Sequence, residues 1–142
     1  MSAAEHFFDT NVLLYLLSSD TVKADRAEDI IAAGGTISVQ VLNEFSAVAL
    51  RTLRINAAEV REALEPITAI CTVVPLTFNM HQRALAVAER YGFSFYDALI
   101  AAAALDAGCT TLYTEDLQDG QLIEGALTVK NPFRSSPGHG AQ

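Results

Sequence analysis

Four acidic residues stand at positions from which a folded chain could gather them: Asp9, Glu44, Asp97 and Asp116. Asp9 ends a short apolar run, and Asp116 follows another such run by a few residues. Glu44 borders the apolar stripe of an amphipathic helical pattern, and Asp97 begins the most apolar helical pattern of the chain. Two carboxylates ~4 Å apart repel by roughly 4 kcal/mol at an effective dielectric constant of 20. If these acids converge, some must be protonated or cations must bind between them.

The ligand chemistry of such a centre predicts its cofactor. Sites built only from oxygen favour hard divalent ions, so we expect Mg²⁺ or Mn²⁺. Such an ion binds a phosphate oxygen, lowers the pKa of a water and stabilises a leaving oxygen. We therefore expect in-line hydrolysis of a phosphodiester by a metal-activated water, without a covalent nucleophile. The three histidines, His6, His81 and His139, are scattered and indicate no acid–base pair.

Each acid also has a purely structural interpretation. Asp9 and Asp97 suit the first turn of a helix, where the helix dipole favours negative charge. Glu44 could extend from the edge of its stripe toward Arg51, and Asp116 suits a turn. The functional hypothesis depends on all four acids occurring together at compatible places.

The elements that must position these acids alternate along the chain. Apolar runs predict strands over residues 6–8, 36–38, 71–76, 109–114 and 127–131. Helical patterns cover residues 11–17, 21–35, 39–54, 57–70, 78–91 and 95–108, with Ser38 and Asn56 as N-caps and a kink or early end expected at Pro66. This alternation is typical of an α/β domain with a mostly parallel sheet. Parallel strands would place Asp9 and Asp116 at the same sheet edge, where such folds bind ligands.

Length and composition limit the classes of protein. A chain of 142 residues with 51% apolar residues predicts one globular domain. A net charge of −8 argues against broad, non-specific nucleic-acid binding, but it is compatible with acids gathered at a metal site. Cys71 and Cys109 lie in apolar runs and are expected to be buried thiols. No signal peptide or membrane-spanning run is recognisable, so we expect a cytoplasmic protein.

Four segments resemble the acidic motifs of the PIN-domain family, in order: FFDTNVLLYLL, SVQVLNEFSAV, FSFYDALIAAAAL and LYTEDLQDG. The resemblance runs from about His6 to Phe133, and DTNVLLYLL and YDALIAAAA are its specific parts. It implies a Rossmann-like α/β/α sandwich with a central, mostly parallel sheet, in one PIN-like nuclease domain over residues 1–133. Residues 134–142, rich in Pro, Gly and Ser, are expected to be a disordered tail.

The resemblance also implies a function and a set of site residues. Asp9, Glu44, Asp97 and Asp116 match the family's catalytic and metal-binding acids, and Asn11 and Thr114 match polar residues that support the site. The implied activity is that of a VapC-type toxin, an Mg²⁺- or Mn²⁺-dependent endoribonuclease. The implied partners are an RNA substrate, a cognate antitoxin protein that blocks the site, and a second copy of the chain.

The fifth acidic position departs from the family pattern. Many relatives carry an acid two residues after the fourth, whereas here Asp119 is three residues after Asp116. Asp119 and Glu115 are therefore alternative supporting acids. Arg51 and Arg83 are candidates for contacts with the RNA backbone, although a solvated surface position explains each of them as well.

Three other classes of function compete with a nuclease. A PIN-like domain without activity would be a binding module, but such a module would not need all four acids. A phosphohydrolase with an aspartyl nucleophile requires an acid two residues after Asp9, where this chain has Asn11. A receiver-type signalling domain requires an acid after the third strand, and none follows Leu76 in the segment TFNM.

Overall fold

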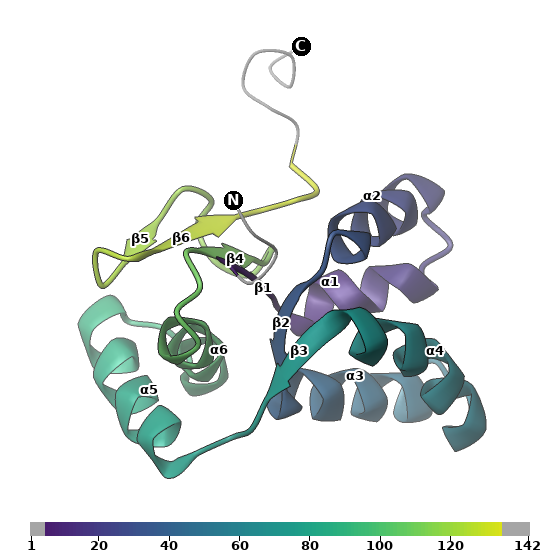
Figure 1. Cartoon of the computed structure of the whole chain (residues 1–142), viewed down its shortest axis with the longest axis horizontal. Helices are drawn as coiled ribbons and strands as arrows, with labels where there is room; N and C mark the ends of the chain where they lie inside the picture. Colours follow the sequence, from purple (N-terminus) through teal and green to yellow (C-terminus); the bar gives the residue numbers. More distant parts are fainter. Residues whose placement is uncertain (1–4, 135–142) are drawn as a thin grey trace.

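A six-stranded sheet forms the centre of the molecule in the order β3–β2–β1–β4–β6–β5 (Figure 1). The structure, a computed structural model, describes residues 5–134. All neighbouring pairs are parallel except β5 and β6, which are antiparallel. The expected mostly parallel α/β sheet is thereby confirmed. The strands are β1 (His6–Phe8), β2 (Gly35–Ser38), β3 (Cys71–Val74), β4 (Thr111–Tyr113), β5 (Leu122–Ile123) and β6 (Leu127–Lys130).

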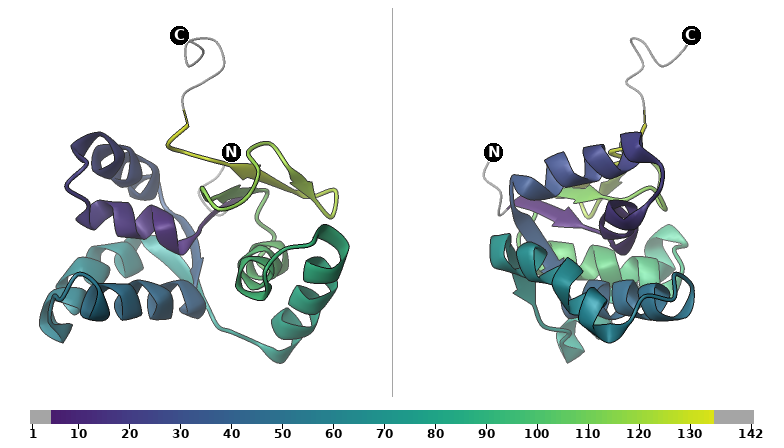
Figure 2. Two further views of the ribbon diagram at one scale, coloured as in Figure 1. Left: turned by 180° about the vertical axis from the view of Figure 1, so that it is seen from behind. Right: turned by 90° about the vertical axis from the view of Figure 1, so that its right-hand side faces the viewer.

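Helices cover both faces of this sheet. Helices α1, α2, α3 and α4 lie on one side together with the 3₁₀ helix η2, and α5 and α6 lie on the other, as the views of Figures 1 and 2 agree. The helices are α1 (Thr10–Leu14), the 3₁₀ helix η2 (Tyr15–Leu17), α2 (Thr21–Ala32), α3 (Val39–Arg51), α4 (Ala57–Ile70), α5 (Phe78–Tyr91) and α6 (Phe95–Asp106). Side-chain caps start five of the α-helices at Asp20, Ser38, Asn56, Thr77 and Ser94.

Burial follows the apolar patterns of the sequence. Phe7 and Phe8 of β1 are completely buried, as are Leu112 of β4 and Val129 of β6. Helix α6 is apolar nearly all round because it packs between the sheet and α5, and every residue from 98 to 104 is buried. This buried helix gives Asp97, in its first turn, a fixed position relative to the strands.

The order of the strands determines where a site can form. From β1 the chain proceeds outward to β2 and β3, and it then returns to place β4 on the other side of β1. The neighbours β1 and β4 therefore flank the point at which the strand order reverses, where open α/β sheets bind their ligands. Asp9 directly follows β1, and Thr114 directly follows β4.

Tight packing on β1 requires a glycine in β2. A Cβ atom at Gly35 would lie 2.6 Å from Phe8 Cε2 and 2.8 Å from the His6 carbonyl oxygen. Gly34, which precedes it with a φ of 86°, ends the connection from α2. The two glycines that the sequence assigns to one helix end thus have different roles, and the second belongs to the sheet.

Several element boundaries differ from the sequence prediction. The helix expected over residues 11–17 is two elements, because the chain tightens from α1 into η2 at Tyr15. Helix α3 ends at Arg51 instead of Arg54, whose φ of 58° is not helical. Pro66 does not end α4, which continues to Ile70 behind a complete capping box at Asn56. The two-residue strand β5 was not predicted, because it is too short to show a period.

Two expectations concern the termini and the membrane. Apart from Arg134, the tail expected over residues 134–142 lies outside the described residues. In the part of the chain that is described, no helix has both the length and the apolar character to span a bilayer.

Candidate metal centre

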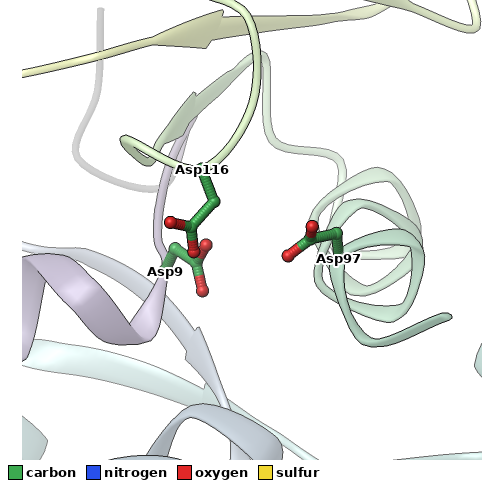
Figure 3. A group of neighbouring side chains, drawn as sticks. All are labelled: Asp9, Asp97 and Asp116. Atoms are coloured by element: carbon green, nitrogen blue, oxygen red, sulfur yellow. The ribbon is translucent and has the colours of Figure 1, made fainter. Parts of the chain in front are cut away.

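Three carboxylates from distant parts of the chain meet beyond the strand ends. Asp9, Asp97 and Asp116 each offer an oxygen, and these oxygens all lie within 4.8 Å of one another. Figure 3 shows Asp97 extending from α6 toward the other two side chains, which lie beside each other at the ends of β1 and β4. Asp9 is buried, Asp97 is half-buried and Asp116 is exposed, so the group opens to solvent on one side.

Thr114 connects two of these acids through its completely buried hydroxyl group. Its Oγ1 donates to Asp9 Oδ2 at 2.7 Å and accepts from the backbone N–H of Asp116 at 3.0 Å. The side-chain amide of Asn11 donates to Thr114 Oγ1 at 3.3 Å and to Asp116 Oδ2 at 3.0 Å. Thr114 and Asn11, which the sequence suggests as supporting residues, therefore hold Asp9 and Asp116 in fixed orientations.

Glu44 lies in the same cavity but outside the group of three. The cavity has a volume of about 190 Å³, and its lining includes all four acids and Tyr96. Thr10 Oγ1 donates to Glu44 Oε1 at 2.8 Å, and Gln40 Nε2 donates to the same oxygen at 3.3 Å. Glu44 is thus fixed through one oxygen, and it does not extend toward Arg51 along its own helix.

Burial and like charge work against ionisation of Asp9 and Asp97. Burial raises the pKa of Asp9 to about 7, and the nearby Asp116 and Glu44 charges add to this effect. Hydrogen bonds from Thr114 and the Thr10 backbone oppose it. Burial also raises the pKa of Asp97, with a further contribution from Asp116. The centre therefore favours the binding of a positive species near neutral pH.

The raised pKa of Asp9 predicts how stability depends on pH without metal. The folded-state pKa is about 7 and the unfolded value 3.8, so this group contributes stability at acid pH that is lost as the pH rises through about 7. In EDTA, the melting temperature should fall between about pH 4 and pH 7, and added Mn²⁺ should reverse the fall at the upper end. Thermal melts across this range measure it. Asp9→Asn should remove the EDTA-dependent fall, and an unchanged slope in that variant would refute the assignment.

The donor set fits a hard divalent ion. Among residues 5–134, the buried polar side-chain atoms without a hydrogen-bond partner are Asn11 Oδ1 and Gln40 Oε1. Asn11 lines the acidic cavity together with the three carboxylates. Carboxylate and amide oxygens are the ligands that Mg²⁺ and Mn²⁺ prefer.

Other residues suggested by the sequence lie in different surroundings. Asp119 accepts from the Asn131 backbone N–H at 2.7 Å and pairs with Arg134 at 3.6 Å. Glu115 accepts from the Tyr15 hydroxyl at 2.7 Å. Arg51 and Arg83 are exposed and do not contribute to the lining of the acidic cavity. These contacts explain the positions of Asp119 and Glu115 without a role in the acidic group.

Sequence reasoning did not single out two residues that contact the site. Gln40 is buried one helical turn before Glu44, and it donates to Glu44 and, at 3.4 Å, to the Tyr96 carbonyl oxygen. The spacing of four residues was the available signal for this pair. Tyr96 lines the cavity, and it precedes Asp97 directly. Its position beside a candidate ligand was the only signal.

Comparison with known proteins identifies the family and supports the fold. A family model described as "PIN domain" matches residues 6–118, which include all four acids. A search of curated proteins found no match. The chain is similar to a solved chain of a toxin–antitoxin complex from Klebsiella pneumoniae, with 21% identity, a TM-score of 0.68, and coverage of 90% of this chain and 98% of that one.

Two further solved structures share the fold. VapC20 from Mycobacterium tuberculosis, described as a sarcin–ricin loop cleaving toxin, has 21% identity and a TM-score of 0.64 over 78% of this chain and 89% of that one. VapBC2 from Rickettsia felis, solved with a fragment of promoter DNA, has 18% identity and a TM-score of 0.63 over 89% and 97%. These likenesses show the arrangement of the sheet and helices that positions the acids.

Proposed function

Because this chain belongs to the PIN-domain family, we propose that it is a divalent-metal-dependent endoribonuclease and the toxin of a type II toxin–antitoxin pair. The convergence of Asp9, Asp97 and Asp116 at the reversal point of the sheet carries this proposal. The similar solved structures support it, since they include a toxin–antitoxin complex, VapBC2, and a sarcin–ricin loop cleaving toxin.

The chain's own groups have distinct roles in the proposed hydrolysis. Asp9, Asp97 and Asp116 would hold an Mg²⁺ or Mn²⁺ ion, with Asn11 and Thr114 fixing their orientation. A bound divalent ion supplies Lewis-acid activation of water and neutralises charge on the phosphate and the leaving oxygen. Glu44 is bound by Thr10 and Gln40 through Oε1, so we assign Oε2 to accept a proton from the attacking water.

A direct assay tests the nuclease. The purified chain should cut RNA in the presence of Mg²⁺ or Mn²⁺ and stop when EDTA removes the ion. Products should carry a 5′-phosphate, because an attacking water displaces the 3′-oxygen of the preceding nucleotide. Metal-independent cleavage, or 2′,3′-cyclic phosphate products, would contradict this mechanism.

An apolar cavity offers a docking place for the antitoxin. It has a volume of about 370 Å³ and lies between η2, α2, α3 and α4, at a distance in the fold from α5 and α6 (Figure 1). Apolar side chains dominate its lining, which includes Leu16, Leu17, Ile31, Phe45, Ile67 and Ile70. A partially exposed apolar recess of this kind suits side chains of an amphipathic segment.

Charge placed in this cavity should weaken the complex. Ile70 lines it and is 49% exposed, so Ile70→Asp should fold normally and still reduce co-purification of a small protein encoded beside the gene. The loss should reach about tenfold or more in affinity, as expected for an apolar contact near the centre of an interface. Val22→Asp is the control, because Val22 is 78% exposed and is not part of the lining. If the native chain, Ile70→Asp and Val22→Asp all retain the small protein equally, this docking place is refuted.

Self-association and growth arrest belong to the same proposal. The family resemblance implies a cytoplasmic protein that forms a homodimer through its helices. Sedimentation of the purified chain measures this oligomeric state. Expression of the chain without its partner should arrest growth. Harmless expression of an active nuclease would leave the enzyme assignment intact and remove the toxin role.

A further inference from the structure

Four aromatic rings form a continuous surface strip that ends at the acidic cavity. The ring of Phe78 stacks on His81 with a centroid distance of 6.2 Å, and His81 lies 5.5 Å from Phe95. Phe95 in turn lies 5.7 Å from Tyr96, which lines the cavity next to Asp97. We call these four residues the aromatic strip. It is built by the first turns of α5 and α6, which pack against each other.

The exposure of the strip requires an explanation. Phe78 is 72% exposed and Tyr96 is 64% exposed, and His81 is also exposed, whereas Phe95 is partly buried against the core. Phenylalanine is among the residues most often buried, so large exposed rings in a connected group indicate contact with another molecule. The core holds its own aromatic residues, Phe7, Phe8 and Phe45, completely buried. A lack of space in the core therefore does not explain why these rings are exposed.

The net charge of the protein limits the ways in which the strip could hold a nucleic acid. Most nucleic-acid-binding surfaces obtain affinity from basic residues that neutralise phosphates. This chain has a net charge of −8 and gathers carboxylates at its centre. Basic residues therefore contribute little to its affinity for a nucleic acid. Stacking of bases on aromatic rings is an uncharged alternative, and it tolerates any sequence because every base has a π-face.

We propose that the aromatic strip binds unpaired bases of single-stranded RNA next to the phosphodiester that is cut. This inference rests on the proposed nuclease function and deepens it, because it names the residues that would hold the substrate beside the acidic cavity. Tyr96 makes the strip continuous with the acidic cavity, so a strand stacked on the rings would deliver its phosphate to the carboxylates. Bases in a duplex are already stacked on one another and cannot reach the rings.

Binding of a labelled RNA tests this proposal without cleavage. The probe is a short fluorescein-labelled single-stranded oligoribonucleotide of mixed sequence, and its fluorescence anisotropy is followed in an Asp97→Asn background so that it stays intact. Phe78→Ala should weaken binding by on the order of tenfold, and Phe78→Trp should retain it. Leu85→Ala is the matched control, because Leu85 is an exposed apolar residue two turns along α5 from Phe78 and outside the strip. The same strand annealed to its complement should bind more weakly and be insensitive to Phe78→Ala.

The outcomes separate this inference from the nuclease proposal. If the native chain cuts no RNA but single-strand binding depends on Phe78, the nuclease proposal fails and the strip remains an RNA site. If the native chain cuts RNA but Phe78→Ala binds the probe like its parent, or the parent binds no probe, this inference is overturned. It is also overturned if Phe78→Ala leaves RNA binding unchanged and converts a dimer to a monomer in sedimentation, which would assign the strip to a second copy of the chain.

Discussion

Replacement of Asp97 by asparagine should abolish RNA cleavage while the chain stays folded. The Asp97 carboxylate closes the group of three from the α6 side, and its hydrogen-bond partner is Ser94, the N-cap of the same helix. Asparagine has nearly the same shape but lacks the charge, so it weakens ion binding directly. A bound ion contributes several kcal/mol to phosphodiester hydrolysis, so the rate should fall by about three orders of magnitude.

A second aspartate in the same helix provides the control for this variant. Asp106 ends α6 and is exposed, and its spacing of nine residues places it on the opposite side of the helix from Asp97. Asp106→Asn changes the net charge by the same amount and should keep near-native activity. Cleavage rates with a defined RNA, circular dichroism and Mn²⁺ titration compare the two variants. Equal losses in both would mean that charge alone, and not the acidic centre, determines activity.

Replacement of Thr114 by valine should lower Mn²⁺ affinity by about 10- to 100-fold, the usual range for residues that orient metal ligands. Valine fills the space of threonine, so the buried site at the end of β4 stays packed. The variant loses the hydrogen bond to Asp9 Oδ2 and leaves the Asn11 amide and the Asp116 N–H without that acceptor. Asp9 then loses the hydrogen bond that lowers its pKa most, so deprotonation requires a higher pH.

The pH profile distinguishes positioning from general damage to the fold. In Thr114→Val the midpoint for Mn²⁺ binding should move to higher pH, since Asp9 must lose its proton before it binds the ion. Thr111→Val, at a buried threonine of β4 three residues before Thr114, should lower stability without moving that midpoint. Identical pH midpoints in Thr114→Val and the native chain would show that Thr114 does not act through Asp9.

The sequence predicts the parts of the site that depend on regular elements. Asp9 and Asp116 could be assigned to one sheet edge because β1 and β4 have readable apolar runs and because parallel strands share their carboxyl ends. Asp97 could be placed because a helix that is apolar all round must be buried, which fixes its first turn against the sheet. In these cases the apolar character of the run is enough to place the element in the core.

The remaining parts of the site depend on geometry that no period encodes. The spacing of Asp119 after Asp116 does not reveal that the loop turns Asp119 toward Asn131 and Arg134. The helical position of Glu44 predicts that it borders the apolar stripe of its helix. It does not predict that Thr10 and Gln40 hold its Oε1. Likewise, Phe78, His81 and Tyr96 form one strip only because α5 and α6 pack with their first turns together.

A crystal of the native chain soaked in MnCl₂ tests the central claim most directly. Manganese scatters anomalously, so its position can be determined without assumptions about its ligands. We expect a strong anomalous peak within about 2.0–2.3 Å of oxygens from Asp9, Asp97 and Asp116, as hard divalent ions require. A peak bound elsewhere, or a cavity that holds only water at saturating Mn²⁺, would contradict the account.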